Sequence, residues 1–155
     1  MKLRFYGVRG SYPIARTDQI RYGGNTTCLH IEFAGGQHLI IDAGSGMRSL
    51  GKALMQREFG RGEGKAHILI SHTHWDHIMG LPFFAPFYQQ GNRFSIVCAE
   101  QSGVNIREIL AGQQTGLHFP VPFTDLRAEF EYQTIRAGDS LSLDYCDIHS
   151  VQLNH

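Results

Sequence analysis

The sequence carries no excess of charge of either sign, no long apolar run and few cysteines. Its 155 residues include 14 basic and 14 acidic side chains, which gives a formal net charge of +0. This balance argues against a strongly basic nucleic-acid-binding chain, and no exosite for a polynucleotide is evident. The longest apolar run, residues 81–87, is too short and too rich in proline to cross a bilayer. We therefore expect no association with a membrane.

Cysteine usage and the N-terminal residues both point to the cytoplasm. Cys28, Cys98 and Cys146 are widely spaced and form no Cys-x-x-Cys motif. An odd count in a chain of this size argues against a disulfide framework. Each cysteine is flanked by apolar residues of the kind found in strands, which predicts small buried side chains. Residues 1–7 contain no continuous apolar stretch of the kind that a secretory signal needs.

The composition and the apolar patterns of the sequence fit one domain over residues 1–155. Hydrophobic residues make up 42% of the chain and charged residues 18%, a balance typical of folded rather than disordered proteins. Apolar patterns predict strands over 3–8, 26–33, 38–41, 67–70, 94–99, 127–135, 140–143 and 145–153. Helical spacing predicts helices over 47–59 and 104–111, and a further helical segment in or just after 71–77. This order indicates an α/β chain (α+β in some schemes) with a mixed β-sheet and helices on one face.

Histidine is the most informative residue type. There are nine histidines, and three of them fall within the six residues His72-Thr73-His74-Trp75-Asp76-His77. Imidazole and carboxylate groups suit Zn²⁺, Mn²⁺ or Fe²⁺. In an extended turn after a strand, His72 and His74 point the same way and can share one ion. Asp76 and His77 lie further round the turn and are expected to face a second ion, as in sites that clamp both the attacking and the leaving oxygen.

Two other interpretations of this cluster are weaker. One is a solvated polar loop that contains histidines by accident, and the other is a structural metal site. Structural zinc sites favour cysteine ligands in closed tetrahedra, and no cysteine lies near the cluster in the sequence. The pattern therefore favours a catalytic metal site. Five histidines outside the cluster are expected not to be ligands: His30, His38, His67, His118 and His149.

The pattern His-x-His-x-Asp-His after a strand resembles the metallo-β-lactamase fold superfamily, whose fold is an αβ/βα sandwich with a dinuclear site between its sheets. Asp42, after the strand predicted over 38–41, resembles the aspartate of the family's first motif, which supports the site from behind the ligands. The continuation 80–82, Gly-Leu-Pro, resembles the phosphodiesterase branch, which includes ribonuclease Z-like and cyclic-phosphate hydrolases. Residues 153–155, Leu-Asn-His, resemble the third motif.

This resemblance implies a metal-dependent hydrolase that cleaves phosphodiester or related phosphate-ester bonds through a metal-activated hydroxide. The implied substrate is a small molecule or nucleotide that carries a phosphate ester. The implied catalytic residues are Asp76, which orients the hydroxide, and Asp42, which acts through its neighbours. The implied metal ligands are His72, His74, Asp76, His77 and His155. Zn²⁺ is favoured, with Mn²⁺ or Fe²⁺ as alternatives, and the complete domain would hold two ions.

The resemblance reaches only the first half of the family's sandwich. The family's later motifs, which supply a bridging aspartate and another histidine, have no counterpart in these residues. We therefore expect a single metallo-β-lactamase-like domain that is truncated after the third metal motif. Its expected partner is a second copy of the chain or the missing C-terminal half. Two alternatives stay open: a thioester or lactam hydrolase of the same superfamily, and an inactive, truncated metal-binding module.

Overall fold

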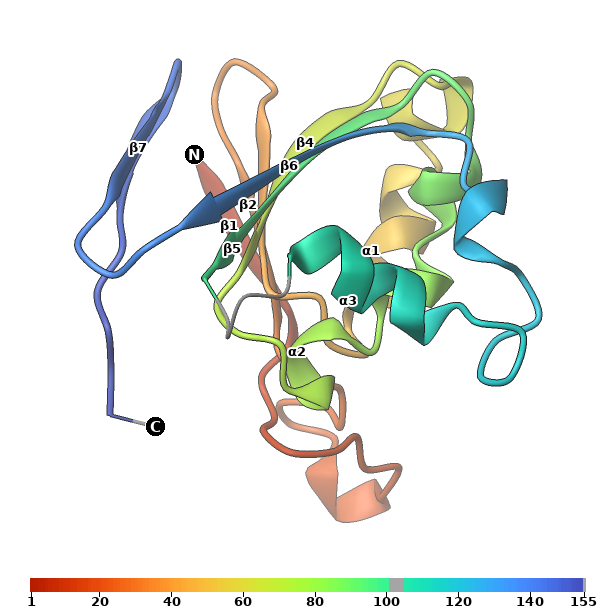
Figure 1. The fold of residues 1–155 in the computed structure, drawn as a ribbon. Helices are drawn as coiled ribbons and strands as arrows, with labels where there is room; N and C mark the ends of the chain where they lie inside the picture. Colours follow the sequence, from red (N-terminus) through yellow and green to blue (C-terminus); the bar gives the residue numbers. More distant parts are fainter. Residues whose placement is uncertain (101–104, 155) are drawn as a thin grey trace.

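The computed structural model describes residues 1–100 and 105–154, and its main feature is a six-stranded sheet with helices against one face (Figure 1). The strands of this sheet are β1 (Lys2–Gly7), β2 (Cys28–Glu32), β3 (His38–Ile41), β4 (Lys65–Ile70), β5 (Arg93–Ala99) and β6 (Glu129–Ile135). A separate hairpin contains β7 (Ser140–Leu143) and β8 (Cys146–His149). The α-helices are α1 (Met47–Leu54), α2 (Trp75–Ile78) and α3 (Ile106–Gln113).

Short 3-10 helices complete the fold and fill the connections between these elements. They are η1 (Thr17–Gln19), η2 (Glu58–Arg61), η3 (Leu81–Phe83), η4 (Ala85–Tyr88) and η5 (Phe123–Asp125). Among the described residues, no helix is long and apolar enough to cross a membrane. The predicted α/β architecture, with a mixed sheet and helices on one face, is confirmed.

Strand order and direction bring the ends of four strands to one edge of the sheet. The order is β1-β2-β3-β4-β5-β6. Strands β1 to β3 pair antiparallel, whereas β3 to β6 run parallel. Parallel neighbours need long crossovers, and α1, α2 and α3 lie in the three crossovers of this sheet. The residues that follow β3 and β4 therefore meet at the same edge.

The hydrophobic core lies between the sheet and the helices. Strand β4 alternates, so Ala66, Ile68 and Ile70 are buried toward the helices. Helix α1 adds a buried stripe that includes Met47 and Leu50. Segment 83–87 was expected to be core rather than a platform for stacking bases. Its two fully packed rings, Phe84 and Phe87, belong to the core, although Phe83 is exposed.

The helix predicted over 47–59 ends early, at Leu54. A turn follows, and η2 places Phe59 in the core with no exposed surface. The ring of Phe59 packs on His38 and Phe94, with centroid distances of 5.2 and 5.9 Å. Burying an aromatic side chain stabilises a fold by roughly 1.5–3 kcal/mol, so this packing outweighs continuation of the helix. The helix predicted over 104–111 is α3, and position 104 lies outside the described residues.

The other face of the sheet presents apolar side chains. The register places Leu3 opposite Ile31 and Phe5 opposite Leu29. The same face continues across the sheet through Leu39, Ile41, Leu69 and Val97. The β7–β8 hairpin lies on this side of the sheet (Figure 1). At the edge strand β1, Leu3 and Phe5 are 46% and 60% exposed.

Leu39 and Val97 on this face are buried, whereas Leu3 and Phe5 of β1 are exposed. These exposed apolar side chains are expected to make the chain associate, because exposed apolar patches favour contact between molecules. Multi-angle light scattering should give a mean mass above that of a monomer. The double change Leu3→Thr and Phe5→Thr keeps strand propensity and should return the mass toward the monomer value. Leu117→Thr is the control, since Leu117 is 94% exposed in a turn away from the sheet. A monodisperse monomer for the unchanged chain would contradict the prediction.

Candidate metal centre

The predicted site lies at the carboxyl ends of two neighbouring parallel strands. Asp42 follows the last residue of β3, and the histidine cluster follows the last residue of β4. In open α/β sheets, ligands bind in the crevice outside the carboxyl ends of the strands. The topology therefore brings together residues that are some thirty positions apart in the sequence, since the Ser71 N–H donates to Asp42 Oδ1 at 2.8 Å.

Backbone contacts hold α2 against the loop that follows β3. The Ala43 N–H donates to the His77 carbonyl at 2.7 Å, and the Gly80 N–H donates to the Ala43 carbonyl at 2.8 Å. Side chains are excluded here, because a Cβ on Gly44 would collide with the Asp76 carbonyl and one on Gly80 would collide with the Gly44 carbonyl. Glycine at both positions lets the segment of the metal motif lie directly on this loop.

Asp42 orients the His77 ring by contacting Nδ1, while the other ring nitrogen, Nε2, faces Asp76. Its carboxylate is buried, with 4% of the residue exposed, and its Oδ2 lies 2.8 Å from His77 Nδ1. A carboxylate acceptor at this distance places the imidazole proton on Nδ1 and leaves Nε2 as the electron-pair donor. Asp42 also has φ of +58°, a left-handed conformation that aspartate tolerates better than most residues.

The motif side chains form two pairs of potential donor atoms. His72 Nε2 lies 3.0 Å from His74 Nδ1, and Asp76 Oδ2 lies 3.3 Å from His77 Nε2. Two ligands at about 2.0–2.2 Å from one tetrahedral ion lie about 3.3–3.6 Å apart. Both separations are close to this value. The rings of His72 and His77 also lie 4.1 Å apart between their centroids, so the two pairs belong to one cluster.

Each predicted ion would receive only two ligands from the described residues. Within residues 1–100 and 105–154, no three His, Cys, Asp or Glu side chains are arranged to hold one ion together. His155, which the sequence predicts as a third ligand beside His72 and His74, lies outside the described residues. The chemistry and pairwise spacing of the donors therefore fit a divalent metal, and each ion would need further ligands.

Asp76 has a contact that the sequence does not predict. The Ser11 N–H donates to Asp76 Oδ2 at 2.8 Å. Partial burial opposes ionisation of this carboxylate, but the Ser11 N–H and the imidazoles of His77 and His72 outweigh burial and lower the pKa of Asp76. Asp76 is therefore an anion at neutral pH, as a metal ligand must be.

Comparison with known families identifies the chain. A family model described as the Anti-Pycsar protein Apyc1 matches residues 1–155. The chain belongs to the Apyc1 family. A ribonuclease Z from Haloarcula marismortui is 23% identical over 149 residues, which cover 89% of this chain. The chain spans 44% of the length of that relative. Both matches agree with the superfamily that the histidine motif indicates.

In this Apyc1-family protein, two histidines and a glutamate form a hydrogen-bonded chain away from the metal motif. His30 Nε2 lies 2.9 Å from His38 Nδ1, and His38 Nε2 lies 2.8 Å from Glu58 Oε1. Burial, reinforced by the neighbouring His38, lowers the pKa of His30 to about 4. His30 is therefore neutral at pH 7. No motif in the sequence predicts the link to Glu58, because it joins a strand to a 3-10 helix through packing alone.

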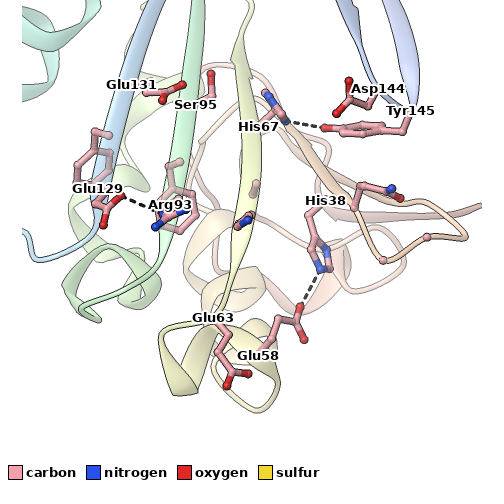
Figure 2. A pocket seen from close by; sticks show the side chains of 17 residues that line it. His38, Glu58, Glu63, His67, Arg93, Ser95, Glu129, Glu131, Asp144 and Tyr145 are labelled. Atoms are coloured by element: carbon pink, nitrogen blue, oxygen red, sulfur yellow. Dashed lines mark hydrogen bonds and ion pairs between the residues drawn. The ribbon is translucent and has the colours of Figure 1, made fainter.

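A pocket of about 640 Å³ lies at the opposite end of the parallel strands (Figure 2). Its lining includes the first residues of β4, β5 and β6, which are Lys65, Arg93 and Glu129. The hairpin closes one side, where the Tyr145 hydroxyl lies 2.7 Å from His67 Nδ1. Of the predicted metal ligands that the structure describes, none lines this pocket, so its position does not bear on the metal site.

The cysteines of the Apyc1-family chain take no part in the predicted chemistry. Burial raises the pKa of Cys28 to about 12 and that of Cys98 to about 11. Both remain thiols at neutral pH, and thiols are poor ligands and nucleophiles. Cys146 on β8 is only half-buried, so the expectation of a buried side chain is correct for two cysteines and wrong for the third.

Proposed function

We propose that this Apyc1-family chain forms a divalent-metal site for the hydrolysis of phosphodiester or related phosphate-ester bonds. The observation that carries the proposal is the arrangement of two donor pairs at the carboxyl ends of β3 and β4. His72 and His74, with His155, would hold one ion. Asp76 and His77 would hold the other. Zn²⁺ suits these ligands best, and Mn²⁺ or Fe²⁺ are the alternatives.

The chain's own residues would prepare the site for this reaction. When bound, the ions supply positive charge and water of lowered pKa. Asp42 fixes the Nδ1 proton of His77 through the contact of 2.8 Å, so that Nε2 faces Asp76. The Asp76 carboxylate, held by the Ser11 N–H, can accept a hydrogen bond from the attacking water and orient it. These contacts support a catalytic role for Asp76 and a supporting role for Asp42 in the proposed reaction.

Two observations support a phosphodiester substrate, and a third concerns its size. The ribonuclease Z match is to a protein whose name describes an enzyme that acts on RNA. The Gly80-Leu81-Pro82 sequence after the motif resembles the phosphodiesterase branch. The formal net charge of +0 favours a small phosphate ester or nucleotide over a polynucleotide, which basic surfaces attract. A second copy of the chain, or a C-terminal half, is proposed as the partner that supplies the remaining ligands.

The test is turnover by the purified chain with Mn²⁺ or Zn²⁺ on a substrate panel. The panel contains an activated phosphodiester, a cyclic mononucleotide, a short RNA, a thioester and a lactam. We expect the phosphate diesters to be cleaved fastest. His74→Ala should lower the rate by more than about 100-fold, since even loss of an outer partner of a ligand costs about 10–100-fold. His118→Ala is the control, because the His118 side chain contacts Thr115 on the surface.

The panel also decides between the alternatives. Faster cleavage of the thioester or lactam would contradict the phosphodiester proposal in favour of another hydrolase of the superfamily. Metal binding without turnover on any substrate would contradict it in favour of an inactive metal-binding module. Equal rates for His74→Ala and the unchanged chain would show that the activity does not come from this site.

A further inference from the structure

A backbone group from the N-terminal loop reaches the metal motif. The Ser11 N–H donates to Asp76 Oδ2 at 2.8 Å, across 65 positions of sequence. The same oxygen lies 3.3 Å from His77 Nε2, so this contact fixes one member of the second donor pair. The loop between β1 and β2 lies at the same end of the sheet as α2 (Figure 1).

The backbone at Ser11 is held in a sparsely populated conformation. Its φ is +69°, a value that is uncommon outside glycine. The Tyr12 N–H donates to the Gly10 carbonyl at 3.0 Å, which closes a three-residue turn around Ser11. A positive φ at the centre marks the rarer, strained form of this turn.

Hydrogen bonds on both sides hold this turn in place. The N–H groups of Val8 and Arg9 each donate to the Asn25 carbonyl at 3.1 Å, and the Ile14 N–H donates to the Gly24 carbonyl at 2.9 Å. The turn is therefore tied to the chain just before β2 and cannot relax without breaking these bonds. Strain that the surroundings maintain in this way is typical of functional sites.

Asp42 is a second residue with a positive φ that contacts the metal motif. In the described part of the chain, the non-glycine residues with positive φ are Ser11 and Asp42. Asp42 holds His77 through its carboxylate, and Ser11 holds Asp76 through its N–H. The two strained residues thus contact the two members of one donor pair.

We infer that the Ser11 backbone N–H positions the Asp76 carboxylate, and that the strained 10–12 turn exists to present it. Ser11 is a positioning residue, because it acts through Asp76 and not on the substrate. The inference rests on the proposed function only for the role of Asp76 as a ligand. The hydrogen bond itself requires no metal, so it can be measured in the metal-free chain.

Three substitutions separate the amide from the serine side chain. Ser11→Gly keeps the N–H and favours a positive φ, whereas Ser11→Ala keeps the N–H and removes only the hydroxyl. Ser11→Val disfavours the left-handed backbone, because its side chain is β-branched. In competition titrations with a chromophoric chelator, Ser11→Val should bind Zn²⁺ about 10-fold more weakly. The glycine and alanine variants should bind as the unchanged chain does.

Hydrogen exchange followed by NMR tests the contact without metal or turnover. The Ser11 amide should exchange slowly in the metal-free chain and lose its protection in Asp76→Ala. Asp125→Ala, which removes a carboxylate elsewhere, should leave it protected. An unprotected Ser11 amide, or equal losses of affinity for Ser11→Ala and Ser11→Val, would overturn the inference. Protection that depends on Asp76, in a chain that binds no metal, would uphold the contact and contradict the proposed function instead.

Discussion

Replacing Asp42 by asparagine is expected to weaken metal binding by about 10–100-fold while leaving the chain folded. Asparagine tolerates the φ of +58°, and its carbonyl can still accept the Ser71 N–H that bonds Asp42 Oδ1 at 2.8 Å. Its amide group, however, would face His77 Nδ1 as a donor where the carboxylate is now an acceptor. His77 would then carry its proton on Nε2, the nitrogen that faces Asp76, and could not donate an electron pair to a metal.

Asp42→Ala should lower both the free energy of unfolding and the metal affinity more than Asp42→Asn does. It removes the acceptor of the Ser71 N–H and leaves His77 Nδ1 with the longer contact to Ser71 Oγ at 3.4 Å. Loss of a partner costs a buried polar group about 1–3 kcal/mol, and these partly buried groups should show the lower end of that range. Urea unfolding should therefore show a loss for alanine that asparagine largely avoids. Chelator competition measures the affinity, and nitrogen NMR reports the His77 tautomer. Asp18→Asn is the control, since its ion pair with Arg16 is exposed. Normal zinc affinity in Asp42→Asn would contradict this account of His77.

The sheet could be predicted from the sequence because its strands carry local signals. Strand β3 has the predicted bounds, His38–Ile41, and β4 extends the predicted run by two residues. Alternation along each strand marks which side chains face the helices, and four-residue apolar runs mark buried parallel strands. The end of α1 could not be predicted this way. It depends on Phe59, which packs on His38 and Phe94 from distant parts of the chain.

The candidate site could likewise be predicted only where the sequence carries a local signal. The spacing of His72, His74, Asp76 and His77 identifies two donor pairs, because neighbouring positions in a turn have fixed relative directions. The Ser11 contact has no such signal, since a backbone N–H looks alike at every residue. The hydrogen-bonded chain from His30 to Glu58 is also invisible in sequence, as its members meet only after β2, β3 and η2 have packed together.

That hydrogen-bonded chain is expected to make the fold sensitive to acid. Burial, together with the charges of His38, Arg57 and Arg4, lowers the pKa of His30 to about 4 against a smaller opposing effect of Glu32. Well above pH 6.5, His30 is neutral in both the folded and the unfolded chain. As the pH falls through 6.5, His30 binds a proton in the unfolded chain but stays neutral in the folded chain. The free energy of unfolding therefore decreases until the pH reaches about 4, where the folded chain also binds the proton.

The size and origin of this decrease can both be measured. One pKa unit corresponds to about 1.4 kcal/mol, and with a discount for solvent screening the His30 contribution should reach about 2 kcal/mol near pH 4. Urea unfolding at intervals from pH 7 to pH 4 follows it. His30→Gln does not titrate and can still donate to His38 Nδ1, so its stability should fall less steeply over this range. His118→Gln, at a surface histidine, should keep the original slope. An equal slope in His30→Gln would show that the acid sensitivity comes from other groups, and that burial of His30 is not what limits the fold at low pH.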